Sequence, residues 1–542
     1  MKFKLNLLAS ALALSSIAHA SDEPFKINTF ATFSNEDVKF DESAAEIVAF
    51  DSTSQKFFVV NAQTNTIDVL VIDEQYVFGK DESCTDGNLD LSLTNVSGGP
   101  NSVAVHNGLV AVAVEDDPKQ NPGEVAFYNA IDCSFVSSIQ VGALPDMLTF
   151  TQNGTKVIVA NEGEPNDAYD IDPEGSISII DISAGPASAT VATADFHAFN
   201  GKEKQLRKRG IRIFGPNANA SMDLEPEYIT TSNGLAYVTL QENNALAVVD
   251  INKAKVISIN SFGTKKFKRK RNALDYTNKD GAINIVPAPL VGMYQPDSVT
   301  SFDYHGETYI VTANEGDARD YDGFSEEVRA EDLNLDANLI ASFPGFSNKD
   351  DLGRPRVTNV DGDIDGDGDI DKVHMYGARS ITVWRFNQRG KLRKVGDTGS
   401  ILERAVADQF PALFNANNDA DGIDNRSDDK GPEPEALTVE FIGGIPYAFV
   451  GLERSSLIAI FDLSWPKKPT LVQLFGNRVS GANTSKALTD GDKFVTTPGL
   501  DLGPEGLDYI PSHQSPTGKP LLAVANEVSG TTTLYTIELK YN

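Results

Sequence analysis

The sequence has 542 residues, of which 40% are hydrophobic, and a formal net charge of −31. This hydrophobic content can fill a sizeable core, which excludes wholesale disorder. The acidic excess repels nucleic acid and anionic membrane surfaces and attracts cations, so we expect no nucleic-acid partner. No apolar run after the N-terminal segment approaches the roughly 18 residues that span a bilayer, so we expect no membrane span.

The N-terminal residues have the pattern of an export signal. Two lysines precede an apolar stretch that ends in the small-x-small sequence Ala-His-Ala, whose last residue is Ala20. Residues 1–20 are therefore predicted to be a signal peptide, and the mature chain is expected in the periplasm or outside the cell. In an oxidising compartment the two cysteines, Cys84 and Cys133, are expected to form a disulfide.

A strand–turn–strand unit recurs along the mature chain. A typical copy opens on Pro and an acidic residue, then runs through an apolar strand, a polar turn with Gly and a second apolar strand. Three copies then read Asn-Glu. Seven copies begin, in chain order, at Ala45, Pro100, Pro145, Pro226, Pro296, Pro434 and Pro504. Each copy holds three or four strands, which favours a β-propeller over a β-helix.

We therefore predict an all-β fold, a seven-bladed β-propeller that forms one domain over residues 21–542. Wide spacings between copies indicate inserts near 195–225, 262–295, 320–375 and 395–433. The alternating segment 25–33 precedes the first copy. We expect it to pair as the outer strand of the last blade, which closes the ring and removes a free edge. The two cysteines fall late in the first two copies, which would place them on outer strands of neighbouring blades.

The repeat also gathers acidic residues. The first strand of each blade lines the channel of a propeller, and the residues that follow the opening position are Glu46, Asn101, Asp146, Glu227, Asp297, Glu435 and Glu505. The second strands end at Glu115, Glu162, Glu242, Glu315, Glu453 and Glu527. Repetition would carry each set into a ring, and the two rings could lie at opposite ends of the channel. Such carboxylates either accept hydrogen bonds from backbone N–H groups or form a cation-filled mouth or an acidic active site.

The most specific short motif is an acidic loop, "NVDGDIDGDGDIDKVH", at residues 359–374. Its residues match a calcium loop at the ligand positions and at the glycine of the sharp turn. The predicted Ca²⁺ ligands are Asp363, Asp365, Asp367, Asp369 and Asp371. His374 replaces the bidentate Glu at the last position, which leaves a solvated acidic turn as the alternative. A second acidic loop, with Asp419, Asp421 and Asp424, is equally compatible with a cation site and with a plain loop.

Two basic clusters lie in the inserts, at residues 202–212 and 265–271. They suit either the binding of a phosphate or sulfate group or solvated hairpins that balance nearby acids. The sequence contains no HExxH, GxSxG or phosphate-loop motif. If the protein is an enzyme, a metal held by carboxylates is the expected means of catalysis.

Several long phrases resemble the choice-of-anchor I family of secreted bacterial proteins. They include "NEGEPNDAYDIDPEGSISIIDI" from Asn161, "TANEGDARDYDGFSEEVR" from Thr312 and "RSDDKGPEPEALTV" from Arg426. The resemblance covers residues 25 to 540 and implies a YVTN/WD40-like β-propeller. Some members of the family carry the label of atypical alkaline phosphatase, which implies a phosphatase activity that no motif in the sequence indicates.

Two functions are compatible with these features. The first is a calcium-binding platform for adhesion or binding, whose partner is an unknown extracellular ligand. The second is a calcium-dependent phosphomonoesterase that acts on a phosphorylated small molecule at the acidic mouth. The candidate catalytic residues are Glu162, Glu227, Asp297, Glu315, Asp317 and Arg319. The first function requires fewer assumptions, because a binding platform needs no catalytic motif and the sequence carries none.

Overall fold

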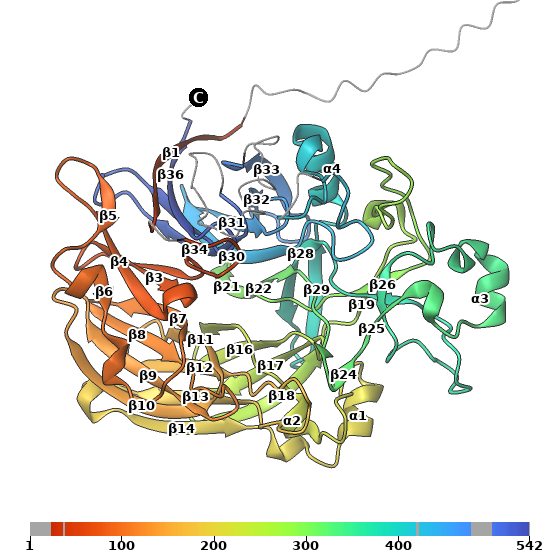
Figure 1. Ribbon diagram of the computed structural model, residues 1–542, viewed down its shortest axis with the longest axis horizontal. Helices are drawn as coiled ribbons and strands as arrows, with labels where there is room; N and C mark the ends of the chain where they lie inside the picture. Colours follow the sequence, from red (N-terminus) through yellow and green to blue (C-terminus); the bar gives the residue numbers. More distant parts are fainter. Residues whose placement is uncertain (1–22, 36–37, 419–421, 479–500, 541–542) are drawn as a thin grey trace, which may run out of the picture.

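The computed structural model describes residues 23–35, 38–418, 422–478 and 501–540. The predicted signal peptide lies outside these residues, as do Asp419 and Asp421 of the second acidic loop. Four-stranded antiparallel sheets follow one another around the molecule in chain order (Figure 1). The prediction of an all-β fold is confirmed, and the arrangement is propeller-like.

The first four sheets are each built from consecutive strands. The first contains β2 (Val48–Asp51), β3 (Lys56–Asn61), β4 (Thr66–Ile72) and β5 (Phe78–Lys80), with β6 (Asn88–Leu89) paired to β4. The second contains β7 (Pro100–His106), β8 (Leu109–Val114), β9 (Pro122–Asn129) and β10 (Phe135–Ala143). The third contains β11 (Pro145–Phe150), β12 (Lys156–Asn161), β13 (Ser176–Asp181) and β14 (Thr190–Asp195). The fourth contains β15 (Ile229–Ser232), β16 (Leu235–Leu240), β17 (Ala245–Asp250) and β18 (Lys255–Ser261).

Two of the three remaining large sheets, the fifth and the seventh, include strands that are distant in sequence, whereas the sixth is built from consecutive strands. The fifth contains β21 (Val299–Tyr304), β22 (Glu307–Asn314), β28 (Ser380–Phe386) and β29 (Leu392–Asp397). The sixth contains β30 (Pro434–Ile442), β31 (Ile445–Leu452), β32 (Leu457–Asp462) and β33 (Thr470–Phe475). The seventh contains β34 (Pro504–Ile510), β35 (Leu521–Asn526), β36 (Thr531–Leu539) and β1 (Phe25–Ser34). Each predicted copy of the repeat therefore supplies the first two strands of one sheet.

Local sequence explains why these hairpins form. The turns between the first and second strands are two residues long in several sheets, as at Asn107-Gly108 and Asn233-Gly234, and both residues have positive φ. Such turns match the twist of antiparallel strands. The second strands are buried on both faces. In β12, Ile158 and Ala160 join one hydrophobic cluster, whereas Val157 and Val159 join another.

Two kinds of contact relate the sheets to one another. The first strands touch in the order β2, β7, β11, β15, β21, β30 and β34, and β34 also touches β2. Strand β1 pairs antiparallel with β36, from Phe25 opposite Leu539 to Ser34 opposite Thr531. The N-terminal strand is therefore the outer strand of the seventh sheet, where the alternation of residues 25–33 predicted it.

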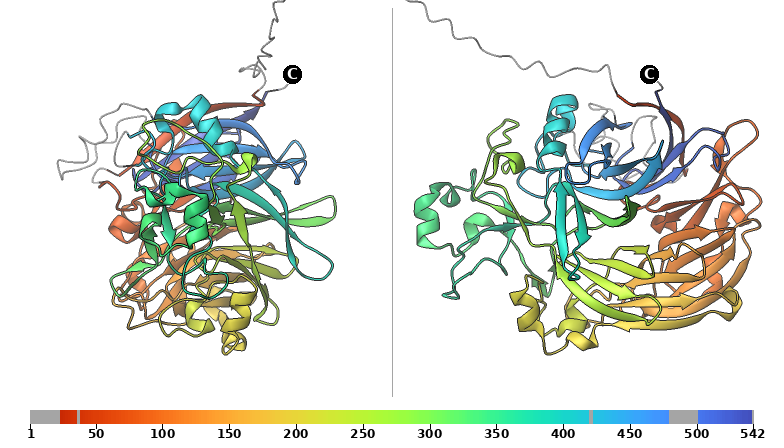
Figure 2. Two further views of the ribbon diagram at one scale, coloured as in Figure 1. Left: turned by 90° about the vertical axis from the view of Figure 1, so that its right-hand side faces the viewer. Right: turned by 180° about the vertical axis from the view of Figure 1, so that it is seen from behind.

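The inserted segments form short elements beside the sheets. Between β14 and β15 lie α1 (Glu203–Lys208) and α2 (Ala220–Asp223), and α4 (Ile401–Gln409) follows β29. The other inserts contain β19 (Thr264–Lys266), β20 (Val291–Met293), β23 (Asp320–Tyr321), β24 (Phe324–Ser325), β25 (Glu327–Arg329), α3 (Ala337–Ser342), β26 (Arg356–Thr358) and β27 (His374–Met375). They share a hydrophobic cluster around Phe267, Phe346 and Val357. Figures 1 and 2 show α3 and its neighbours projecting to one side of the sheets.

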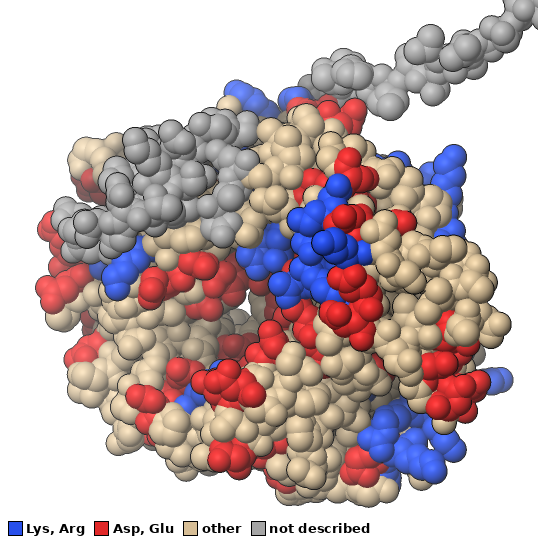
Figure 3. All heavy atoms as spheres, turned by 45° about the vertical axis from the view of Figure 1, so that its right-hand side comes forward, with Lys and Arg blue, Asp and Glu red and all other residues tan. Residues whose placement is uncertain are grey.

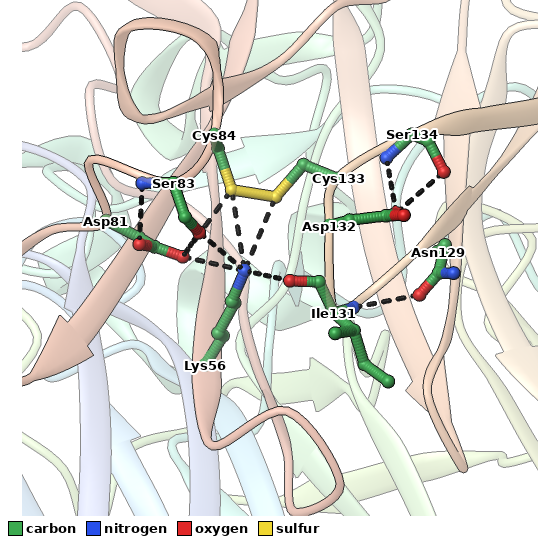
Figure 4. Close-up of a disulfide and its surroundings, with 9 residues drawn as sticks. All are labelled: Lys56, Asp81, Ser83, Cys84, Asn129, Ile131, Asp132, Cys133 and Ser134. Atoms are coloured by element: carbon green, nitrogen blue, oxygen red, sulfur yellow. Dashed lines mark hydrogen bonds and ion pairs between the residues drawn. A yellow bond between two sulfur atoms is a disulfide. The ribbon is translucent and has the colours of Figure 1, made fainter.

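The predicted disulfide is present and links the first two sheets (Figure 4). Cys84 and Cys133 lie in loops, after β5 and between β9 and β10, rather than on outer strands as predicted. The buried Lys56 lies beneath the bridge. Its Nζ is 2.6 Å from a carboxylate oxygen of Asp81 and donates a hydrogen bond to the Ile131 carbonyl. Of the helices in the described residues, none is long and apolar enough to cross a membrane.

Candidate functional site

The two sets of repeated acids lie at the same end of the sheets. Pro145 pairs with Asn161, and Pro504 pairs with Asn526, so the start of each first strand lies beside the end of the second strand. The acids that follow the Pro and the Asn of each hairpin therefore lie at the same edge of the sheet. The expectation that the two rings lie at opposite ends was wrong, because antiparallel pairing within each hairpin brings the start of the first strand beside the end of the second.

A cavity of about 120 Å³ opens between the first strands. Its acidic lining residues are Glu46, Asp146, Glu162, Glu227, Asp297 and Glu505. Figure 3 shows acidic side chains gathered around a hollow in this face, next to a group of Lys and Arg residues. Three of the six candidate catalytic residues, Glu162, Glu227 and Asp297, thus share one cavity. We call this region the acidic mouth.

The carboxyl groups of the acidic mouth are kept from ionising freely. Burial, followed by repulsion from neighbouring acids, raises the pKa of Glu162, Glu227 and Asp297 well above the usual range. Burial also raises the pKa of Asp146 to about 7 and that of Glu242 to about 7. Each of these groups is therefore stabilised by a proton or by a bound cation.

Several of these carboxylates lack hydrogen-bond donors. One buried side-chain oxygen has no partner among the described residues in each of Glu227, Glu242, Glu435 and Glu505. The alternative in which repeated acids accept backbone N–H groups does not hold for these oxygens. An unpaired buried carboxylate oxygen is costly, so this arrangement favours a cation.

Within the mouth, Glu162, Glu227 and Glu242 form a carboxylate group whose ligand oxygens lie within 4.8 Å of one another. Glu162 follows β12, Glu227 precedes β15 and Glu242 follows β16. Sequence reasoning did not select Glu242 as a site residue, although the repeat placed it at the end of a second strand.

Another carboxylate group is already neutralised by basic side chains. Glu315, Glu433 and Glu453 also have oxygens within 4.8 Å of one another. Lys430 Nζ lies 2.6 Å from Glu315 and 3.4 Å from Glu433, and Arg454 lies 3.1 Å from Glu433 and from Glu453. Burial alone would raise the pKa of Glu433, but the neighbouring Lys and Arg residues lower it. This group therefore carries its own cations.

The last two candidate catalytic residues lie in different surroundings. Asp317 has a side chain that is 51% exposed and 3.6 Å from Lys430. Arg319 is 1% exposed and forms ion pairs of 2.5 Å with Asp223 and 2.6 Å with Glu225. Its guanidinium also lies 4.5 Å from the ring centroid of Phe214. Arg319 thus belongs to a buried ion-pair network behind the mouth, whereas Asp317 lies at the rim.

The acidic loop gathers carboxylates on its own. Asp363, Asp365 and Asp371 form one group with oxygens within 4.8 Å, and Asp369 and Asp371 form another with Asp336. Asp363 accepts hydrogen bonds from the N–H groups of Gly366 and Gly368, which shapes the loop. Asp367 lies in neither group. A donor set made only of carboxylate oxygens fits Ca²⁺.

Asp336 was not predicted as a ligand. It is the N-cap residue of α3, where its side chain accepts a hydrogen bond from Leu339 N–H. It approaches the loop because Leu335 and Ile370 form an isolated parallel bridge. No spacing in the sequence signals this contact, since the two segments belong to different parts of the insert. Asp424 of the second acidic loop is buried and accepts a hydrogen bond from Ser427 instead.

The basic clusters do not consist only of solvated hairpins. The first cluster contributes α1 and ends at Arg212, which is buried and pairs with Glu326 and Asp361. The second contributes Lys265, which is buried and donates hydrogen bonds of 2.8 Å to the carbonyls of Ala378 and Gly399. Both clusters therefore supply cations that hold the inserts in place.

Comparison with known proteins gives one family and two curated relatives. The model of the choice-of-anchor I domain matches residues 46–466. Gigasin-3a of Magallana gigas is 37% identical over 190 residues, which are 34% of this chain and 64% of that protein. The mesenchyme-specific cell surface glycoprotein of Strongylocentrotus purpuratus is 28% identical over 321 residues, which are 51% of this chain and 41% of that protein. The chain thus spans less than two thirds of either relative.

Solved structures give more distant similarities. The hydrazine synthase of Kuenenia stuttgartiensis aligns with a TM-score of 0.42 and 12% identity, over 93% of this chain and 97% of that chain. The β-propeller domain of Cps50 (Swd1) from Myceliophteria thermophila aligns with a TM-score of 0.43 and 8% identity, over 95% of this chain and 100% of that chain.

Proposed function

The chain belongs to the choice-of-anchor I domain family, and we propose that it acts outside the cytoplasm as a calcium-dependent binding platform. One relative is named as a cell surface glycoprotein. The disulfide suits an oxidising compartment, as does the predicted signal peptide over residues 1–20. An extracellular or periplasmic location agrees with both.

The platform consists of a closed seven-bladed propeller in one domain over residues 21–542, with inserts on one side. Three observations support this arrangement. Each of seven sheets begins with one copy of the repeat, the first strands touch in a cycle, and β1 completes the last sheet. Pairing between the ends of the chain leaves no free edge in the ring, as in other propellers.

The observation that carries the function is the acidic loop. Asp363, Asp365 and Asp371, together with Asp336 and Asp369, would hold Ca²⁺ through carboxylate oxygens, and Asp367 would complete the loop. When bound, the cation neutralises these repelling carboxylates and fixes the loop against α3.

The experiment is a calcium-dependent binding screen. The purified mature chain is applied to arrays of extracellular glycans and peptides in excess Ca²⁺ and in EGTA. Ligands bound only in Ca²⁺ are then tested with Asp371→Asn, which removes a carboxylate from both loop groups, and with Asp332→Asn, an exposed acid outside them, as the matched control. Loss of binding in Asp371→Asn alone supports the platform. Equal binding by both variants and in EGTA contradicts it.

A phosphomonoesterase is the second candidate, because the acidic mouth combines unpaired carboxylates with nearby Lys430 and Arg454. Metal and basic groups side by side suit an anionic phosphate. The candidate residues remain Glu162, Glu227, Asp297, Glu315, Asp317 and Arg319. The test is release of phosphate from a generic phosphomonoester with Ca²⁺ and with chelator. Turnover that both chelator and Glu315→Gln abolish would make this function primary.

A further inference from the structure

Two largely buried carboxylate groups, each with oxygens within 4.8 Å of one another, differ in their charge balance. The group of Glu315, Glu433 and Glu453 is contacted by Lys430, Arg426 and Arg454. The group of Glu162, Glu227 and Glu242 forms no ion pair with any Lys, Arg or His in the part of the chain that the structure describes. The basic side chains around Glu315, Glu433 and Glu453 thus show which positive charges the group of Glu162, Glu227 and Glu242 lacks.

The group of Glu162, Glu227 and Glu242 is also short of hydrogen-bond donors. Glu242 is 6% exposed, and its Oε2 atom is buried without a hydrogen-bond donor. Glu162 is 8% exposed, and the Oε2 atom of Glu227 is also buried without a donor. Ionised carboxylates in such surroundings are strongly destabilising unless a positive charge is bound between them.

The geometry fits one hard divalent cation. Two oxygens that each lie about 2.3–2.6 Å from Ca²⁺ can be at most about 5 Å apart. The three ligand oxygens here are within 4.8 Å of one another. Glu162 and Glu227 also line the 120 Å³ cavity, which has room for water to complete the coordination.

We propose that Glu162, Glu227 and Glu242 bind one divalent cation of the Ca²⁺ type in the acidic mouth, at a site separate from the acidic loop. Glu162 comes from the third sheet, whereas Glu227 and Glu242 flank strands of the fourth sheet. The cation therefore links two neighbouring sheets. Because water fills its open positions, it also offers a binding position to an anionic group that enters the mouth. This site does not depend on the proposed platform function.

The test counts bound Ca²⁺ in the full mature chain after equilibrium dialysis, by elemental analysis. The acidic loop is first removed as a site with Asp363→Asn/Asp365→Asn/Asp371→Asn. In that background we expect one Ca²⁺ per chain, and we expect Glu162→Gln/Glu242→Gln to abolish it. The matched control is Glu82→Gln, an exposed acid outside the mouth, which should leave the count unchanged. A count that the mouth variants do not lower overturns the proposal.

A second measurement separates the loss of a ligand from misfolding. Without divalent cations, Glu242→Gln should melt at a higher temperature than the parent, because it removes a buried charge. Added Ca²⁺ should raise the melting temperature of the parent, and it should raise that of Glu242→Gln by a smaller amount. If Glu242→Gln instead lowers the melting temperature in chelator and keeps the full gain with Ca²⁺, the carboxylate is structural and the proposal fails. Failure of the platform function alone would leave both readouts unchanged.

Discussion

Replacing Arg319 with Met tests whether this residue is a structural cation or a group available to a substrate. The guanidinium is 1% exposed and is the ion-pair partner of Asp223 and Glu225. The substitution would leave the buried carboxylates of Asp223 and Glu225 without their guanidinium partner. Removing one partner of a buried ion pair costs about 3–5 kcal/mol, because the remaining charge stays desolvated.

The surroundings of the two acids refine this magnitude. Asp223 keeps hydrogen bonds from the N–H groups of Phe214 and Gly215, so it stays partly satisfied. Glu225 keeps no such donor at Oε1, which is already unpaired. The lost contact with the Phe214 ring adds about 0.5–2 kcal/mol. We therefore expect Arg319→Met to lower the free energy of unfolding by about 4 kcal/mol.

The assay is urea denaturation followed by fluorescence of the buried Trp384. The matched control is Arg393→Met, an exposed arginine, which should change stability by less than about 0.5 kcal/mol. Adding Glu225→Gln to Arg319→Met should recover part of the loss, because it removes the stranded charge. If Arg319→Met is as stable as the control, the buried network does not stabilise the fold and the reasoning is refuted.

Three further predictions concern other parts of the fold. The double variant Cys84→Ala/Cys133→Ala should lose about 4 kcal/mol, since the bridge closes a loop of 49 residues; reducing agent should destabilise only the parent. Burial and then Asp508 raise the pKa of Glu440 to about 7. In the folded state Glu440 thus holds a proton that it releases in the unfolded state. The contribution of this proton to folding stability is fully present at low pH and is lost as pH rises through about 7. Glu440→Gln should therefore flatten the decline of melting temperature between about pH 5 and about pH 8, and an unchanged slope would contradict the assignment. Lys430→Met should lower the free energy of unfolding by about 3 kcal/mol in chelator, and added Ca²⁺ should restore part of it. If Ca²⁺ does not raise the stability of this variant, no cation replaces the Lys430 ammonium.

The parts of the fold that depend on local sequence could be predicted. The alternating strands around Asn107-Gly108 and the other hairpins follow from turn residues and periodicity, and the acids at their ends follow from the repeat. The acidic residues were found in this way, including Glu162 and Glu227. Their common end follows from antiparallel pairing of the first and second strands in each hairpin.

Contacts that depend on where the inserts pack could not be predicted. Asp336 reaches the acidic loop only through the bridge between Leu335 and Ile370. Arg319 shares the phrase of Glu315, yet its partners Asp223 and Glu225 come from the segment before the fourth sheet. Such pairings are set by three-dimensional packing between segments about 35 residues apart in the first case and about 95 residues apart in the second, for which spacing and composition give no signal.

The pairing of β1 with β36 has a consequence for the order in which the chain folds. Asn28 and Thr536 face each other across this pair and are 508 residues apart in sequence. Contacts between residues so distant in sequence form late in folding. Closing the long intervening chain costs conformational entropy, and this cost must be met before the contacts can form. During synthesis, β1 emerges before the other strands of its sheet and has no partner until β36 emerges. Until then both β1 and the sheet that lacks it expose unpaired edges, so the nascent chain is most prone to aggregation just before its final strand arrives.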